Sequence, residues 1–159
     1  MGFALSDIQL TSTAFENNGA IQPQHTGEGS DISPSLAWKN PPEGTQAFAV
    51  ICHDPDAPLI SNRGTYGFVH WAYYNIPGSV YTLDEGCNLY TKGANDFGKE
   101  GYNGPMPPNG HGRHRYYYWI LALDSQLDLP AGLTMWELLE QAEPHVIGMN
   151  RLVGSYIRT

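Results

Sequence analysis

The stretch that decides the fold is Pro-Pro-Asn-Gly-His-Gly-Arg-His-Arg-Tyr-Tyr-Tyr-Trp-Ile-Leu-Ala, residues 107–122. Its first half is rich in proline and glycine and its second half is a dense run of aromatic and aliphatic side chains, so a loop passes directly into a buried strand. At the junction lie four polar or basic side chains, His111, Arg113, His114 and Arg115. They are candidates for receiving a small anion at the edge of a rigid sheet, and a loop with solvated charges is the alternative.

The composition of the chain favours short strands joined by many turns. The chain has 159 residues, which is a one-domain length, and we expect a single domain over residues 1–159. It contains 18 glycines, 12 prolines and 10 tyrosines, and only 15% of its residues are charged. This balance is typical of aromatic-rich β structure rather than of long amphipathic helices. We therefore expect a mainly β fold with one or two short helices.

The net charge of −8 argues against nucleic acid as a partner. Binding of DNA or RNA needs a basic face with many phosphate contacts, and this chain has sixteen acidic residues against eight lysines and arginines. A single anion site depends only on local charge and stays open. The first ten residues lack the features of a signal peptide, and no stretch reaches the roughly 18 apolar residues of a transmembrane helix. We expect a cytoplasmic protein.

Apolar runs predict the main strands and one helix. Residues 46–53 carry apolar side chains on both faces, as a buried central strand does. Further strands are expected over 67–76, 115–123 and 146–157, and a long loop over 79–113. A capping box of Thr134 and Glu137 predicts the start of a short helix, which Pro144 ends.

Side-chain alternation predicts which way the polar residues face. In the second run, the residues expected to share one face are Phe68, His70, Ala72 and Tyr74. In the third run, Arg115 is expected to point away from His114 and Tyr116 and to form a structural ion pair. The aromatic residues Trp71, Tyr73 and Tyr74 are a candidate surface for a homodimer, although nothing in the sequence requires one.

Polar residues at the ends of the three central runs converge if the strands are neighbours. Asp54 and Asp56 follow the first run, His70 lies in the second, and His114 and Tyr116 open the third. Together they form a pocket of carboxylates, imidazoles and a phenol. The Cys and His-Glu-x-x-His patterns of common zinc sites are missing from the sequence, so we expect no metal and no cofactor.

The chain resembles the phosphatidylethanolamine-binding protein (PEBP) family, in its bacterial and archaeal, Raf-kinase-inhibitor-like branch. The matching motifs are Asp-Pro-Asp-Ala-Pro at 54–58, His70-Trp71, Pro107-Pro108 and Gly-His-Gly-Arg-His-Arg-Tyr at 110–116. The resemblance implies a β-sandwich with Greek-key connections and a small anion pocket. Carried over residue by residue, that pocket consists of Asp54, Asp56, His70, Gly104, Pro108, His114 and Tyr116. Its implied ligand is a phosphate or the phosphoryl head group of phosphoethanolamine.

The chemistry of such a pocket can also be argued from its residue types. A phosphate needs N–H and O–H donors, which His70, His114, Tyr116 and the Gly104 amide supply. A carboxylate repels a phosphate, so Asp54 is expected to hold an imidazole in its protonated, donating form, or else a carboxylate receives the ammonium of ethanolamine. His111 occupies a variable position of the family motif. Two roles are open for it, a cation at the rim of the pocket and a solvated side chain, and we favour the second.

These features favour a non-enzymatic protein that binds a phosphate or phosphoryl head group, on a small phosphorylated molecule or a phospholipid, in a regulatory or signalling role. One alternative, taken from some relatives in the family, is an inhibitor of a protease or a kinase that acts through a loop such as residues 79–113. A phosphoester hydrolase that uses a histidine as general base is a third, less favoured, hypothesis.

Overall fold

The computed structural model of the protein describes residues 6–61 and 64–159. Its strands are β1 (Gln9–Thr11), β2 (Gly19–Ala20), β3 (Leu36–Lys39), β4 (Ala47–Asp54), β5 (Ile60–Ser61), β6 (Gly64–Thr65), β7 (Phe68–Pro77), β8 (Thr82–Leu83), β9 (Thr91–Lys92), β10 (Arg113–Leu123) and β11 (Val146–Ile157). The helix α1 spans Met135–Ala142, and two short 3-10 helices span Pro23–His25 and Glu143–His145. The mainly β class with few short helices is confirmed.

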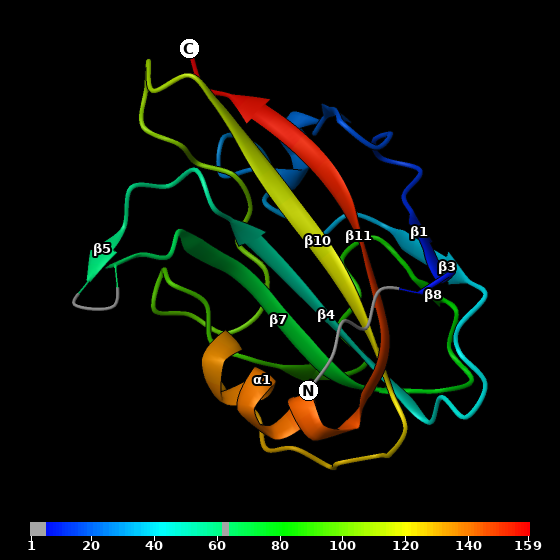
Figure 1. Ribbon diagram of the computed structural model, residues 1–159. Coiled ribbons are helices and arrows are strands. Elements are labelled where there is room, and N and C mark those ends of the chain that lie inside the picture. Colours follow the sequence, from blue (N-terminus) through cyan, green and yellow to red (C-terminus); the bar gives the residue numbers. More distant parts are fainter. Residues whose placement is uncertain (1–5, 62–63) are drawn as a thin grey trace.

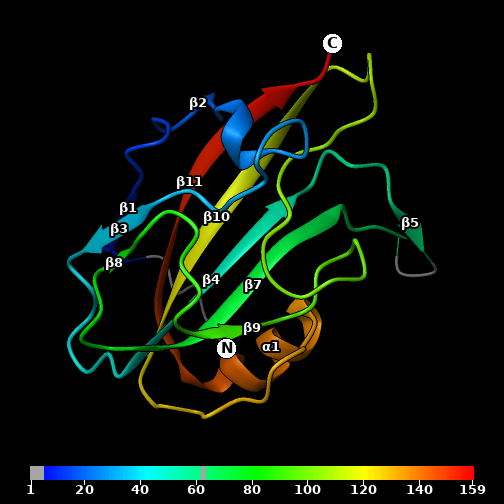
Figure 2. The same ribbon diagram turned by 180° about the vertical axis from the view of Figure 1, so that it is seen from behind.

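Two open sheets pack face to face, and α1 covers the outer face of the larger sheet (Figure 1, Figure 2). The large sheet has the strand order β2-β11-β10-β4-β7-β9, and the small sheet has the order β1-β3-β8. The expected central strands β4, β7 and β10 are antiparallel neighbours in the large sheet. The end of β4 therefore lies beside the beginnings of β7 and β10, which brings their polar residues to one end of the sheet.

The two faces of the large sheet bury two separate groups of side chains. Along β4, the side chains that enter the core between the sheets are Phe48, Val50 and Cys52. Those that face the α1 side are Ala47, Ala49 and Ile51. The prediction of a central strand buried on both faces is confirmed, and burial raises the pKa of the Cys52 thiol.

The helix α1 forms where the capping box predicts it. The Thr134 hydroxyl accepts a hydrogen bond from the Glu137 amide, and the Glu137 carboxylate accepts one from the Thr134 amide, both at 3.1 Å. Pro144 lies in the 3-10 turn that follows the last α-helical residue. The apolar stripe of α1 covers the large sheet through Met135, Leu138 and Ala142. Among the described residues, no helix has the length and apolar character needed to cross a membrane.

The predicted alternation along β7 is wrong at His70. Opposite β4, Cys52 pairs with Trp71 while the next residue, His53, pairs with Val69, so His70 is an extra residue in a β-bulge. Such a bulge redirects the side chains around it. Ala72 and Tyr74 face the α1 side as one group, whereas the His70 ring contacts Tyr116 from the core between the sheets.

Two further expectations change with the structure. The segment 79–113 is not structureless, because it contains β8, β9 and a bridge between Ala94 and Glu100. The aromatic residues considered as a dimer surface, Trp71, Tyr73 and Tyr74, are buried within the chain itself. They are therefore part of the core, and a homodimer stays a prediction without this surface.

Candidate functional site

A cavity of about 240 Å³ lies where β4 ends and where β7 and β10 begin. It is lined by Asp54, Ala57, Pro58, Leu59, Phe68, His70, Phe97, Met106, Pro107, Pro108, His114 and Tyr116. Its volume is below the roughly 300–1,000 Å³ of pockets for drug-sized ligands, so it suits a small group. Five of the seven predicted site residues line it, namely Asp54, His70, Pro108, His114 and Tyr116.

Asp54 and His114 form a buried pair at the polar end of this cavity. The Oδ2 atom of Asp54 lies 2.7 Å from Nδ1 of His114, and both side chains are almost fully buried. The other carboxylate oxygen, Oδ1, accepts a hydrogen bond from the Asp56 amide at 2.8 Å, which is the local turn that an Asp-Pro-Asp sequence favours. Asp54 thus holds the His114 ring in one orientation, and neither of its oxygens lacks a partner.

His111 reaches back to the second ring nitrogen of His114. Nδ1 of His111 is hydrogen-bonded to Nε2 of His114, and the two ring centroids are 4.8 Å apart. His111 is exposed, as expected of a solvated side chain, but its ring also has a specific partner in His114, which was not predicted. Asp54, His114 and His111 form a continuous chain from the buried end of the cavity to the surface.

His70 enters the cavity as a neutral imidazole. Its Nδ1 lies 2.7 Å from the carbonyl oxygen of Asn103, which accepts the ring proton. The rings of Phe68, Phe97 and Tyr116 surround it with centroid distances of 5.0, 5.6 and 5.2 Å. Burial lowers the pKa of His70, and the hydrogen bond to Asn103 opposes this only in part. At neutral pH its remaining nitrogen, Nε2, is an acceptor.

Tyr116 supplies a hydroxyl that has no hydrogen-bond partner among the described residues. The side chain is fully buried and lines the same cavity as His70 and His114. Burial, and next the negative charge of Asp54, raise the pKa of the phenol, so the hydroxyl keeps its proton and can donate it in a hydrogen bond. Buried polar groups without a partner are rare and call for an explanation.

Asp56 does not line the cavity. Its Oδ2 atom accepts a hydrogen bond from the backbone amide of Arg115 at 2.8 Å and lies 4.0 Å from the Arg115 guanidinium. Arg115 faces away from the cavity, and its predicted ion pair is confirmed. Because both side chains are substantially exposed, this pair contributes little to stability. Asp56 instead ties the turn after β4 to the first residues of β10.

Gly104 is also outside the cavity, and its amide is already bonded. The amide donates to Oδ1 of Asp31 at 2.7 Å. A Cβ atom at this position would collide with the carbonyl oxygen of His25. The glycine is therefore required for close packing of two loops, and the predicted donor to a ligand is occupied within the protein.

The apolar walls of the cavity were not anticipated as site residues. They include Leu59, Phe68, Phe97 and Met106. Phe97 and Met106 belong to the long segment 79–113. Loops of that length in a compact domain are often functional, so the length of this segment is the sequence feature that could have indicated these two residues. Among the described residues, no group of three or more His, Cys, Asp or Glu side chains is placed to hold a metal ion.

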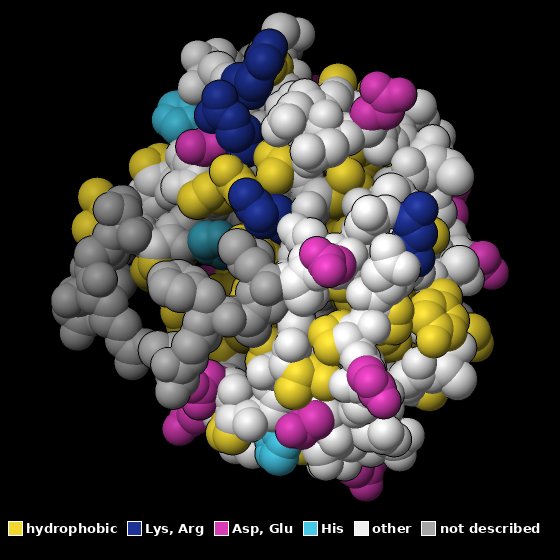
Figure 3. All heavy atoms as spheres, turned by 45° about the vertical axis from the view of Figure 1, so that its right-hand side comes forward, with side chains coloured by type: hydrophobic (Ala, Val, Ile, Leu, Met, Phe, Trp, Pro, Cys, Tyr) yellow, Lys and Arg dark blue, Asp and Glu magenta, His cyan; other side chains and the backbone are white. Residues whose placement is uncertain are grey.

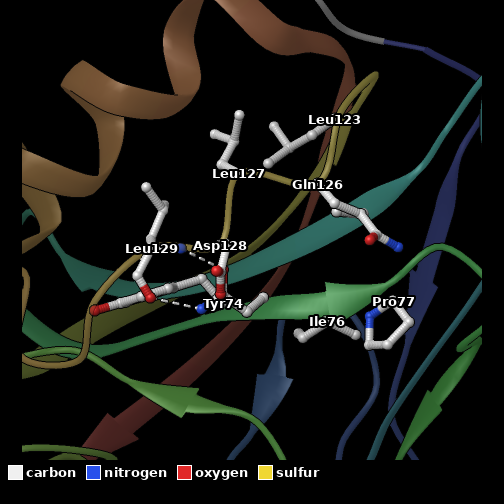
Figure 4. A pocket seen from close by; sticks show the side chains of 10 residues that line it. Tyr74, Ile76, Pro77, Leu123, Gln126, Leu127, Asp128 and Leu129 are labelled. Carbon is white, nitrogen blue, oxygen red and sulfur yellow. Dashed lines mark hydrogen bonds between the residues drawn. The ribbon is translucent and has the colours of Figure 1, made fainter.

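A second cavity, of about 360 Å³, lies at the opposite end of β7 and next to the segment 126–129. Figure 4 shows Leu123 and Leu127 on one side of it and Ile76 and Pro77 on the other. Its principal polar side chains are satisfied within the protein, since Tyr74 donates to the Pro130 carbonyl at 2.6 Å. Although this cavity is larger, it offers no buried polar group without a partner, so the smaller cavity is the stronger candidate.

Comparison with known proteins shows the family to which the chain belongs. The sequence profile of the family described as phosphatidylethanolamine-binding protein matches residues 11–157. A UPF0098 protein of Aquifex aeolicus is 37% identical over 158 residues, which cover 95% of this chain and 89% of that protein. A UPF0098 protein of Pyrococcus abyssi is 40% identical over 167 residues, covering 99% of this chain and 90% of that one.

Solved structures give the same result for the fold. YbcL of E. coli, a member of the mammalian PEBP family, matches with a TM-score of 0.88 and 28% identity, covering 97% of this chain and all of that one (100%). The PEBP homolog CT736 of Chlamydia trachomatis matches with a TM-score of 0.87 and 34% identity, covering 96% and 98% of the two chains. The chain therefore belongs to the phosphatidylethanolamine-binding protein family.

Proposed function

We propose that this protein binds a small anion, a phosphate or the phosphoryl head group of a phosphorylated molecule, in the cavity at the end of β4, β7 and β10, and that it does so without catalysing a reaction. The observation that carries the proposal is the Tyr116 hydroxyl, which is buried in that cavity without a partner among the described residues. A phosphoryl oxygen is the acceptor that such a donor lacks.

The groups beside Tyr116 suit an anion that is held by few contacts. Asp54 is bonded to His114 and orients that imidazole, and both of its carboxylate oxygens accept hydrogen bonds inside the protein. His70 adds a second imidazole to the lining of the cavity, and its Nε2 can donate to an anion when the ring has taken up a proton. The apolar walls keep water away from these groups and strengthen each hydrogen bond that a ligand makes to them.

Local positive charge favours an anion even though the whole chain is acidic. Figure 3 shows lysine and arginine side chains gathered at the end of the molecule where the C-terminus lies. Arg113 and Arg115, in the first residues of β10, and Arg158, which follows β11, belong to this end. Carboxylates compensate part of this charge, because Asp56 lies 4.0 Å from Arg115 and Glu28 lies 3.8 Å from Arg158. An electrostatic field at a cleft depends on such local groups more than on net charge.

The residues that line the cavity argue for binding rather than hydrolysis. Among the described residues, they include no serine, threonine, cysteine or lysine, and the carboxylate oxygens of Asp54 and the ring nitrogens of His114 are already hydrogen-bonded within the protein. The Asp54–His114 pair has the arrangement of a general base, but among the described residues that line the cavity there is no serine or threonine hydroxyl and no cysteine thiol for it to activate. This arrangement supports recognition of a phosphoryl group and not its transfer.

Replacing Tyr116 with phenylalanine tests the proposal. The Tyr116→Phe variant should bind inorganic phosphate and phosphoethanolamine about ten- to a hundredfold more weakly, because it lacks one charge-assisted hydrogen bond of roughly 1.5–3 kcal/mol. Its stability without ligand should be equal or higher, since the lost hydroxyl has no partner among the described residues. Calorimetric titration and thermal unfolding measure the two quantities.

The control is Tyr117→Phe, which removes a hydroxyl from the next residue of β10, on the opposite face of the strand. This variant should bind both ligands as the parent does. Failure of the parent protein to bind either ligand at millimolar concentration would refute the proposed function. Equal binding by the parent and Tyr116→Phe would show that the anion does not use this cavity.

A further inference from the structure

His114 has no ring nitrogen left for a ligand. An imidazole has two nitrogens, and here Asp54 is bonded to Nδ1 while His111 is bonded to Nε2. Building on the proposed function, we infer that His111 is an internal competitor, which occupies the position on His114 that an anion takes, and that anion binding displaces its ring. Its position in the chain and the contacts of its loop support this inference.

The backbone around His111 allows its side chain to leave. Gly110 and Gly112 flank it with positive φ angles of 76° and 90°, and a Cβ atom at either glycine would meet open space. The loop is tied down through its backbone, by hydrogen bonds from the His111 amide to Pro108 and from the Gly110 amide to Arg158. The His111 side chain is itself exposed, so its departure uncovers no part of the core.

Displacement of His111 would complete a set of donors in the cavity. The Tyr116 hydroxyl and Nε2 of His114 belong to rings that lie on the same face of β10, 6.4 Å apart between centroids and nearly parallel. Once His111 leaves, Nε2 of His114 is available beside the Tyr116 hydroxyl. When the ring carries protons on both nitrogens, Nδ1–H is held by the Asp54 carboxylate and Nε2–H is the donor for an anion.

Competition of this kind has a defined consequence for affinity. A ligand replaces the hydrogen bond between His111 and His114 by its own hydrogen bond to His114. Only the difference in free energy between these two hydrogen bonds therefore contributes to the affinity of the ligand. The net contribution of one such bond implies that removal of His111 tightens anion binding by about two- to tenfold. Removal of a residue with only a structural role, or of one that helps to hold the anion, would not increase the affinity for the anion.

The test compares phosphate binding by the parent, His111→Ala and His145→Ala. His145 is the matched control, because it is a partly exposed histidine bonded to one side chain, Asp124, at 3.0 Å, and it does not line the cavity. We expect His111→Ala to bind inorganic phosphate more tightly than the parent and His145→Ala to bind it equally. In the parent, the ¹⁵N resonance of His114 Nε2 should shift as phosphate replaces His111, and the His111 ring should lose its coupling to that nitrogen.

The outcomes separate this inference from the proposed function. If the parent binds phosphate but His111→Ala binds it equally or more weakly, His111 is not a competitor, while the anion site stands. If the His111–His114 bond persists in the phosphate-saturated parent, the inference is likewise overturned. If neither protein binds phosphate, the proposed function fails, and this inference fails with it.

Discussion

Burial of His70 predicts that the proposed anion binding depends on the uptake of a proton. Its pKa is lowered by burial, so the free ring is neutral at neutral pH and presents an acceptor to the cavity. An anion favours the protonated ring, whose Nε2 donates. Above the lowered pKa, each fall of one pH unit raises the protonated fraction tenfold, so affinity should increase as the pH falls and level off below that pKa.

Sulfate is the appropriate probe for this prediction, because its own charge does not change between about pH 8 and about pH 5.5. Titrations across this interval should show sulfate affinity rising by up to about tenfold per pH unit in the parent. The His70→Asn variant keeps a donor near the Asn103 carbonyl but cannot titrate, so its affinity should change much less. A parent whose sulfate affinity is independent of pH would contradict the assignment of His70.

For single residues, the sequence predicts the direction of a side chain correctly where the strand alternates regularly. His114 and Tyr116 are two residues apart in β10, and both enter the cavity as expected. The direction of His70 depends on a bulge, which no local pattern in its strand signals. The partner of the Gly104 amide, Asp31, is 73 residues away in the chain, so only the folded structure shows that this donor is already occupied.

The helix α1 is short, and its capping box should contribute measurably to stability. The Thr134→Ala variant loses the hydroxyl that accepts from the Glu137 amide, and we expect its free energy of unfolding in urea to fall by about 1 kcal/mol. Thr134→Ser retains that hydroxyl and should lose much less. An equal loss in both variants would mean that the methyl group of Thr134, and not the cap, stabilises this end of the helix.

The sequence predicts the long strands and the helix, but not the shortest strands. The expected strand over 146–157 coincides with β11, and the capping box marks the beginning of α1. The two-residue strands β8 and β9 were not anticipated, because so short a run carries no periodicity. They exist because β3 and β7 offer free edges to which the long segment can pair.

At the scale of the whole molecule, the small sheet closes the core that the large sheet leaves open. Its strands are short, and so small a sheet is stable only when its apolar face is covered. Leu10, Leu36, Trp38 and Leu83 supply that face and pack with the side chains of β4 and β10. The sheet at whose end the 240 Å³ cavity lies is thus covered on one face by β1, β3 and β8 and on the other by α1.

Trp38 should be among the residues that couple the two sheets most strongly. It is 3% exposed, its ring centroid lies 5.2 Å from that of Phe48 in β4, and its Nε1 donates to the Val80 carbonyl at 3.1 Å. Trp38→Ala removes this packing and leaves a cavity, so its free energy of unfolding should fall by about 3–5 kcal/mol.

Trp136 provides the control, because it is 47% exposed on α1, and Trp136→Ala should lose about 1 kcal/mol or less. If Trp38→Ala does not fold, Trp38→Phe, which keeps a ring but not the donor, should show an intermediate loss; losses no greater than that of Trp136→Ala would mean that the small sheet is not coupled to the large one.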